Sequence, residues 1–281
     1  MNPKRTTHLS DLITECHHLF RQDVTRCAVE KLICSFLRSS DLFHQIYNAV
    51  GAIPIQGSQE KLCAIPKSFP RFEPHAYQSI GAPYGSFSPY SLRQSVITRL
   101  CQAQQTLNSL KPGYQLKIFD GYRPLSVQSY MVDHTLKIVT KKRGYLNPIT
   151  DDQKKSAMRE VLKVWAIPNN DPLAPPPHST GAAIDLTIID SEGKQLEMGC
   201  PIDHMGVEAE SNYYTEKTGR FERIVNKNRH LLADSMESAG FHRLPHEWWH
   251  FSYGDQWWSF LRSMRTRSYP PHSEKAIYER I

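Results

Sequence analysis

Long apolar runs are missing from this 281-residue sequence. None approaches the roughly 20 residues that span a bilayer, so a transmembrane protein is not expected. The N-terminus begins with basic residues but has neither an apolar core nor a small-residue cleavage site, which predicts no secretory signal. Internal repeats and low-complexity linkers are also missing, and 40% of the residues are hydrophobic, so a fibrous or disordered chain is excluded.

The C-x-x-C motif is also missing, although the chain has six cysteines. This excludes a zinc ribbon and a thioredoxin-type redox site. Cys16, Cys27 and Cys34 are spaced so that they would share one face of a helix, which predicts free thiols in a buried helical stripe. With no secretory signal, free thiols favour a reducing cytoplasm.

A large excess of positive charge is missing, since the formal net charge is only +6. A dedicated nucleic-acid binder is expected to be more basic. The excess comes partly from residues 141–143 and partly from Arg262, Arg265 and Arg267, none of which coincides with an aromatic motif. A solvated charged surface is the simplest interpretation, so we expect no nucleic-acid partner.

Hydrophobic periodicity and turn residues predict the secondary structure. Helices are expected over residues 10–50, 91–110, 124–140, 152–165 and 219–238, and strands over 115–120, 183–189 and 248–253. Residues 51–90 predict loop with short strands, 141–151 predict loop, and the prolines of 169–177 exclude regular structure. Helices and strands follow no regular βαβ alternation, which favours an α+β fold with an antiparallel sheet flanked by helices. We expect a helical N-terminal extension over 1–50 and one larger domain over 51–281.

The first motif with chemical content runs from His178 to Asp185 (HSTGAAID). A histidine follows a proline-fixed loop, and the chain then turns through Gly181 into the strand predicted over 183–189. The three aliphatic residues that alternate with Asp185 are typical of a core face. Asp185 therefore points away from that core, among small neighbours, where there is room for an ion.

The second motif is Glu247-Trp-Trp-His250. Residues three apart in a regular strand point to opposite faces, so Glu247 must lie at the strand entry if it shares a site with His250. Two histidines and one carboxylate form a three-ligand set that suits zinc, with a fourth position open for water. Glu247 would be the spare acid that takes a proton from that water.

Each motif taken alone is weak. Pairs of histidine and aspartate at this spacing are frequent by chance, and Trp248, Trp249 and Phe251 could simply be core aromatics. Spacing alone does not show that the two motifs meet in space.

Together, however, the two motifs resemble the zinc D,D-peptidases, and in particular the D-alanyl-D-alanine dipeptidases associated with vancomycin resistance. Residues 119–124 (FDGYRP), residues 198–203 (MGCPID) and the run from 229 to 241 resemble further segments of that family in the same order. The resemblance covers roughly residues 80–260. The first fifty or so residues and residues 141–155 look like additions.

The resemblance implies a catalytic zinc site in a central cleft. His178, Asp185 and His250 would bind one zinc ion per chain, and Glu247 would act as the general base. Bound zinc can lower the pKa of water to about 7, which would supply the nucleophile near neutral pH.

Two further roles follow from the resemblance. Arg123 would stabilise the oxyanion, and Asp203 would receive the free ammonium of the dipeptide. Other interpretations remain open from the residues alone: Arg123 could form a structural pair with Asp120, and Asp203 could serve a turn or helix cap after Pro201. Where the family has a serine two residues before the first zinc histidine, this chain has Pro176, which leaves the details of substrate specificity open.

The leading hypothesis is a cytoplasmic zinc D,D-dipeptidase that hydrolyses D-Ala-D-Ala to free D-alanine, for recycling or for glycopeptide resistance. A D,D-carboxypeptidase or endopeptidase acting on peptidoglycan peptides is the alternative, although it would normally require export. A zinc-bearing binding module without catalysis would need neither Glu247 nor Arg123. The expected partner is the small dipeptide, and the N-terminal helices either pack on the catalytic domain or make a homo-oligomer.

Overall fold

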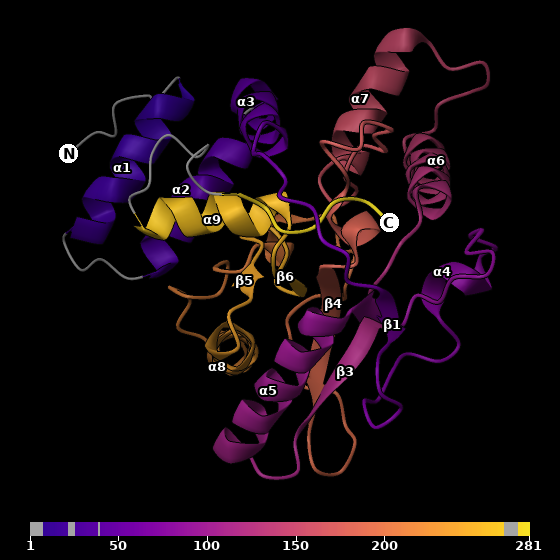
Figure 1. Cartoon of the computed structure of the whole chain (residues 1–281). Coiled ribbons are helices and arrows are strands. Elements are labelled where there is room, and N and C mark those ends of the chain that lie inside the picture. The colour runs from indigo at the N-terminus through magenta and orange to yellow at the C-terminus, as the bar shows by residue number, and fades with distance from the viewer. Residues whose placement is uncertain (1–7, 22–25, 39, 267–274) are drawn as a thin grey trace.

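The predicted α+β class is confirmed by the architecture of the sheet and its helices (Figure 1). The structure, a computed structural model, describes residues 8–21, 26–38, 40–266 and 275–281. The main sheet has four antiparallel strands in the order β3 (Gln115–Asp120), β4 (Ala183–Ile189), β6 (His250–Ser252) and β5 (His242–Arg243). A second sheet pairs β1 (Leu62–Ala64) with β2 (Ser91–Arg93).

The main hydrophobic core lies between the four-stranded sheet and two helices, α5 (Gln94–Leu110) and α8 (Arg220–Ser238). The apolar residues of α5 recur at helical spacing, and Leu100 and Leu107 are fully buried against the sheet. Ile184 and Leu186 of β4 are also fully buried in this core. Burial of each such side chain stabilises the fold by about 1.5–3 kcal/mol.

A second layer covers another part of the sheet with α4 (Ala76–Ser79), α6 (Leu125–Lys142) and α7 (Asp151–Val161). Thr150 and Gln153 form a capping box that begins α7, in which each side chain satisfies a backbone N–H of the other residue. Tyr77, Phe119 and Trp165 belong to the hydrophobic cluster of this layer.

The N-terminal helices α1 (Leu9–Arg21), α2 (Arg26–Leu37) and α3 (Ser40–Gly51) gather around α9 (Gln256–Thr266), as Figure 1 shows on the side opposite α6 and α7. Leu12, Ile33, Ile46 and Phe260 lie in their shared hydrophobic cluster. Arg243 of β5 and Glu30 of α2 form a buried ion pair with Nη2 and Oε2 2.8 Å apart. These helices therefore pack on α9 and on the β5 edge of the main sheet. No helix in the described ranges is long and apolar enough to cross a membrane.

Several predicted boundaries are corrected by tertiary pairing. The helix predicted from residue 91 begins at Gln94, because the three residues before it pair with β1. The strand predicted over 248–253 is confined to β6, and Trp248 and Trp249 lie in a turn. Helix α9 was not predicted at all. The helix predicted over 152–165 ends at Val161.

The predicted single stripe of cysteines is wrong. Cys16 lies in α1 and Cys27 in α2, so the two are on separate helices. The side chains of Cys27 and Arg265, and the whole of Arg267, fall outside the described residues.

Candidate metal centre and substrate pocket

The register of the sheet brings Asp185 and His250 together. Asp185 of β4 lies opposite His250 of β6, and opposite Asp120 of β3 on its other side. A bulge between Ile118 and Asp120 shifts the β3 register beside this point. Three polar side chains from three neighbouring strands thus occupy one line across the sheet, although both faces of β4 are buried.

His178 reaches the same point from the short 3₁₀ helix η1 (Pro177–Thr180). Prolines fix the chain before this helix, and Gly181 then adopts φ +72°, a left-handed conformation that favours glycine and that turns the chain into β4. The Nδ1 atom of His178 lies 2.7 Å from the Gly121 carbonyl oxygen. Because a carbonyl only accepts hydrogen bonds, Nδ1 carries the proton and Nε2 keeps a free lone pair.

His178, Asp185 and His250, here called the ligand triad, could hold a metal ion, since their ligand atoms all lie within 4.8 Å of one another. His178 Nε2 is 3.2 Å from Asp185 Oδ2, and His250 Nδ1 is 3.1 Å from Asp185 Oδ1. The second nitrogen of each histidine is held by a hydrogen-bond partner, Gly121 O or Ser252 Oγ. Two imidazoles with fixed outer hydrogen bonds and one carboxylate form a donor set that fits zinc.

Charge in the triad also favours a cation. Burial acts to raise the pKa of Asp185, but His178 and His250 hold it well below its usual range. Burial lowers the pKa of His250, which keeps that imidazole neutral. An ionised carboxylate and a neutral imidazole are the forms that coordinate metal.

Glu247 lies in the turn before β6, as its spacing from His250 required. Its N–H donates to Leu244 O, and its carbonyl accepts from the His250 N–H. This turn places Glu247 Oε2 3.7 Å from His250 Nδ1. Burial, and then the negative charges of Asp185 and Asp203, raise the pKa of Glu247 well above its ordinary value.

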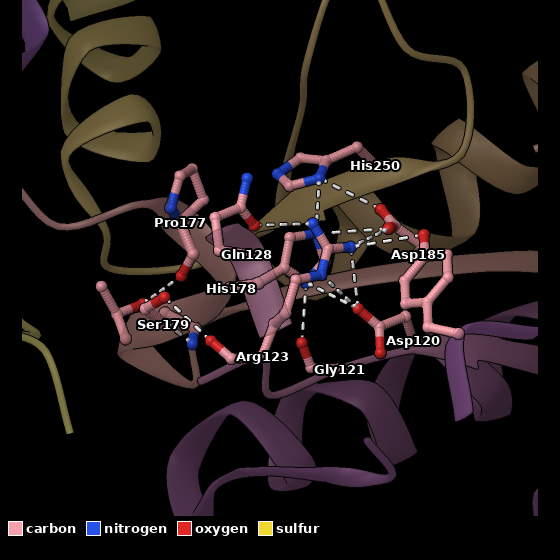
Figure 2. A network of polar contacts seen from close by, with 12 residues as sticks. Asp120, Gly121, Arg123, Gln128, Pro177, His178, Ser179, Asp185 and His250 are labelled. Carbon is pink, nitrogen blue, oxygen red and sulfur yellow. Dashed lines mark hydrogen bonds and ion pairs between the residues drawn. The ribbon is translucent and has the colours of Figure 1, made fainter. Parts of the chain in front are cut away.

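Arg123 is clamped by several side chains (Figure 2). Its Nη2 atom lies 2.8 Å from Asp120 Oδ2, and its Nη1 donates to Gln128 Oε1 at 3.0 Å. The same Nη2 atom is 3.5 Å from Asp185 Oδ2. Burial acts to lower the pKa of Arg123, but Asp120 and the groups beside it raise it above its ordinary value. The structural pair with Asp120 therefore exists, and it aims the guanidinium at the ligand triad.

Asp203 adopts φ +66° and is the one non-glycine residue with positive φ in the described ranges. Aspartate tolerates this conformation better than most residues, at a cost of order 1 kcal/mol, and such backbone is often found at functional sites. Its Oδ2 atom accepts a hydrogen bond of 2.9 Å from Tyr77 Oη. Burial, and then Asp185, raise the pKa of Asp203 to about 7.

All six predicted site residues line one cavity of about 30 Å³, here called the inner cavity. These residues are Arg123, His178, Asp185, Asp203, Glu247 and His250. The structure thus brings together residues spread over much of the sequence. A second cavity of about 330 Å³, the outer cavity, shares part of its wall with the first.

Sequence reasoning missed several residues of this wall and of the contacts behind it. Tyr77, Gln128 and Trp165 contact Asp203 or Arg123, and Tyr47 lines both cavities. No local motif distinguishes these aromatic residues from ordinary core residues. Gln128 could have been found, because it lies on the first turn of the helix that begins just after Arg123.

The family model described as D-ala-D-ala dipeptidase, in peptidase family M15, matches residues 71–272. A D-alanyl-D-alanine dipeptidase of Synechocystis is 42% identical over 239 residues, which cover 82% of this chain and 95% of that protein. A D-alanyl-D-alanine dipeptidase of Enterococcus faecalis is 30% identical over 58% of this chain and 73% of its own length. One from Escherichia coli is 40% identical over 50% of this chain and 55% of its own length.

Proposed function

The chain belongs to the M15 family of metallopeptidases, the D-Ala-D-Ala dipeptidase family, and from that premise we propose that it hydrolyses free D-Ala-D-Ala to two molecules of D-alanine. The proposal depends above all on one observation: the ligand triad, a spare carboxylate and a fixed guanidinium all line the inner cavity. We propose that the triad holds one zinc ion. Bound there, zinc would polarise the peptide carbonyl and lower the pKa of water.

Glu247 is proposed to move the proton. Burial and the neighbouring carboxylates raise its pKa, which makes the ionised carboxylate a stronger base. It would take a proton from the attacking water and deliver it to the amine that leaves when the peptide C–N bond breaks. His246 Nε2 lies 3.6 Å from Glu247 Oε1, and burial lowers the pKa of His246 to about 3, so it faces Glu247 as a neutral group.

Arg123 is proposed to stabilise the negative charge that develops on the former carbonyl oxygen. Its contacts with Asp120 and Gln128 fix the guanidinium before substrate arrives, so little reorganisation is needed in the transition state. Removal of one such donor typically costs about 10²–10³ in rate.

Asp203 is proposed to bind the substrate ammonium. A carboxylate facing an ammonium forms a charge-assisted hydrogen bond, and Tyr77 holds this carboxylate in place. The ammonium would stabilise the ionised form of Asp203 against burial and the charge of Asp185, which both raise its pKa. This arrangement supports a free dipeptide over the alternative substrate, a peptidoglycan peptide with a blocked amino group.

We also propose that residues 1–50 are a helical extension of a catalytic domain over 51–281, and that the enzyme works in the cytoplasm. The thiols support the second proposal: Cys16, Cys34, Cys63, Cys101 and Cys200 are free. Cell fractionation with an antibody to the protein tests it, and recovery outside the cytoplasmic fraction would contradict it.

An assay of amino-acid release tests the activity. We expect release of D-alanine from D-Ala-D-Ala, none from L-Ala-L-Ala, little from a peptidoglycan pentapeptide, and loss of activity with a chelator. Faster release from the pentapeptide than from the dipeptide would favour the D,D-carboxypeptidase. Full activity after removal of all transition metal would refute the zinc site.

A further inference from the structure

Helix α3 contributes to the wall of the active-site pocket from outside the residues that match the family model. The match covers residues 71–272, whereas α3 spans Ser40–Gly51. Its residue Tyr47 lines the inner cavity together with Glu247 and the ligand triad. The N-terminal helices therefore do more than cover the sheet.

Tyr47 is held in place by the packing of α3 on α9. Ile46, its neighbour in the chain, is fully buried in the hydrophobic cluster shared with α9. The Tyr47 ring meets the Trp257 ring edge to face, with centroids 5.4 Å apart. The side-chain amide of Gln256 donates to the Gly51 carbonyl and fixes the end of α3. A ring on a helix anchored in this way can act as a rigid wall.

Tyr47 and Trp257 stand where the two cavities meet. The walls of the inner and outer cavities have five residues in common, namely Tyr47, Ala166, Pro176, Pro177 and Trp257. The two aromatic rings are the bulkiest of these. The outer cavity, of about 330 Å³, has room for a further residue on the far side of these rings.

Tyr47 lies on the Glu247 side of the inner cavity. Its ring packs on Trp257, the Trp257 ring centroid lies 6.1 Å from that of His246, and His246 Nε2 lies 3.6 Å from Glu247 Oε1. Asp203 instead contacts Tyr77 and lines the inner cavity but not the outer one, whereas Tyr47 lines both. A substrate with its ammonium at Asp203 would direct its carboxyl-terminal residue toward Tyr47.

We propose that Tyr47, supported by Trp257, forms the wall of the subsite for the carboxyl-terminal residue and limits its size. This inference rests on the proposed function. A third residue, or a bulky second residue, would have to pass between the two cavities, where the phenol ring stands. Removal of the ring joins the cavities and admits longer or larger substrates.

The experiment compares kcat/KM for three substrates with a free ammonium: D-Ala-D-Ala, D-Ala-D-Phe and D-Ala-D-Ala-D-Ala. Tyr47→Ala should raise the rate on each larger substrate relative to D-Ala-D-Ala by at least about tenfold, the size expected when a pocket stops rejecting a few methylene groups. Tyr47→Phe keeps the ring and should keep the wild-type ratios. Tyr47→Leu should show a smaller shift than Tyr47→Ala, and it preserves an apolar contact with Trp257 if the alanine variant fails to fold.

Ile46→Ala is the matched control, because Ile46 is buried on the same helix but lines neither cavity. It should lower the melting temperature and leave the substrate ratios unchanged. If Ile46→Ala shifts the substrate ratios as much as Tyr47→Ala does, the effect comes from the packing of α3 and the proposal is overturned. Unchanged ratios in Tyr47→Ala and Tyr47→Leu would also overturn it, while the dipeptidase activity of the wild type would still stand. A wild type inactive on D-Ala-D-Ala would overturn both.

Discussion

Asp185 and His250 face each other across two antiparallel strands, with His250 Nδ1 3.1 Å from Asp185 Oδ1. Their opposition depends on the register of β4 and β6, and a slip of one strand by one residue would turn one of the two side chains to the other face, away from its partner. Strand pairing thus places two of the three residues of the ligand triad. The third, His178, comes from the separate 3₁₀ helix η1. The geometry of the candidate metal site is therefore a property of the sheet.

Loss of one ligand should remove both metal and activity. We expect about one zinc ion per chain in the wild type and almost none in His178→Ala or His250→Ala, because two remaining ligands hold zinc weakly. His204→Ala is the control, since His204 is a partly exposed residue outside the inner cavity. Elemental analysis and D-alanine release on the same samples measure both. Retention of a full zinc complement in both ligand variants would refute the assignment.

Glu247→Gln should keep the metal and lose most of the turnover. General-base catalysis is typically worth about 10²–10⁴ in rate, and the amide has the shape of the carboxyl but cannot take the proton. Zinc content and kcat should be measured together. A kcat near that of the wild type in the zinc-loaded variant would place the base elsewhere, and His246 would be the first residue to test.

Arg123→Met should lower both kcat and stability, for separate reasons. Loss of the oxyanion contact should cost about 10²–10³ in kcat. Loss of the ion pair leaves the Asp120 carboxylate buried without its cation, which should lower stability by about 3–5 kcal/mol.

The double variant Arg123→Met with Asp120→Asn separates the two effects. It should recover much of the melting temperature, because the buried charge is gone, but none of the lost kcat. If kcat recovers together with stability, Arg123 has only a structural role.

N-acetyl-D-Ala-D-Ala should be a much poorer substrate than D-Ala-D-Ala. The acetylated nitrogen carries no charge, so the carboxylate of Asp203 would be left unpaired in a poorly hydrated pocket, which is costly. Asp203→Asn should narrow this difference in kcat/KM, because it should lower kcat/KM for the free dipeptide more than for the acetylated one. Equal kcat/KM for both substrates, unchanged in Asp203→Asn, would remove Asp203 from the site and favour the carboxypeptidase.

Stability should fall on the acid side because of His246. Burial lowers its pKa to about 3 in the folded protein, against an ordinary value of 6.5. Below pH 6.5 the unfolded chain therefore binds a proton that the folded chain does not. The stabilising contribution of neutral His246 is present above pH 6.5 and is lost as the pH falls toward 3.

Urea unfolding of the metal-free wild type and of His246→Gln, at several pH values between 7.5 and 4, checks this prediction. The difference in unfolding free energy between them should shift against the wild type by up to about 1.4 kcal/mol for each pH unit below 6.5. A difference that does not change with pH would contradict it.

The sequence by itself determined the elements whose signals are local. The alternation of β4, the periodicity of α5 and the turn through Gly181 are each set by a few neighbouring residues, and each was predicted close to its place. The six residues proposed to carry the chemistry were also predicted from the sequence, because two short motifs and the resemblance of further segments to a known family identified them. Their catalytic roles stay predictions.

Only the tertiary structure decided which side chains surround those residues. Tyr47 reaches the pocket because α3 packs on α9, and Tyr77 reaches Asp203 because α4 packs beside α6; no periodicity encodes those contacts. Trp248 and Trp249 favour a strand by propensity, yet the chain turns there, because the fold instead buries both rings in the main core. Local patterns specify the faces of helices and strands, whereas packing between distant segments chooses which faces meet.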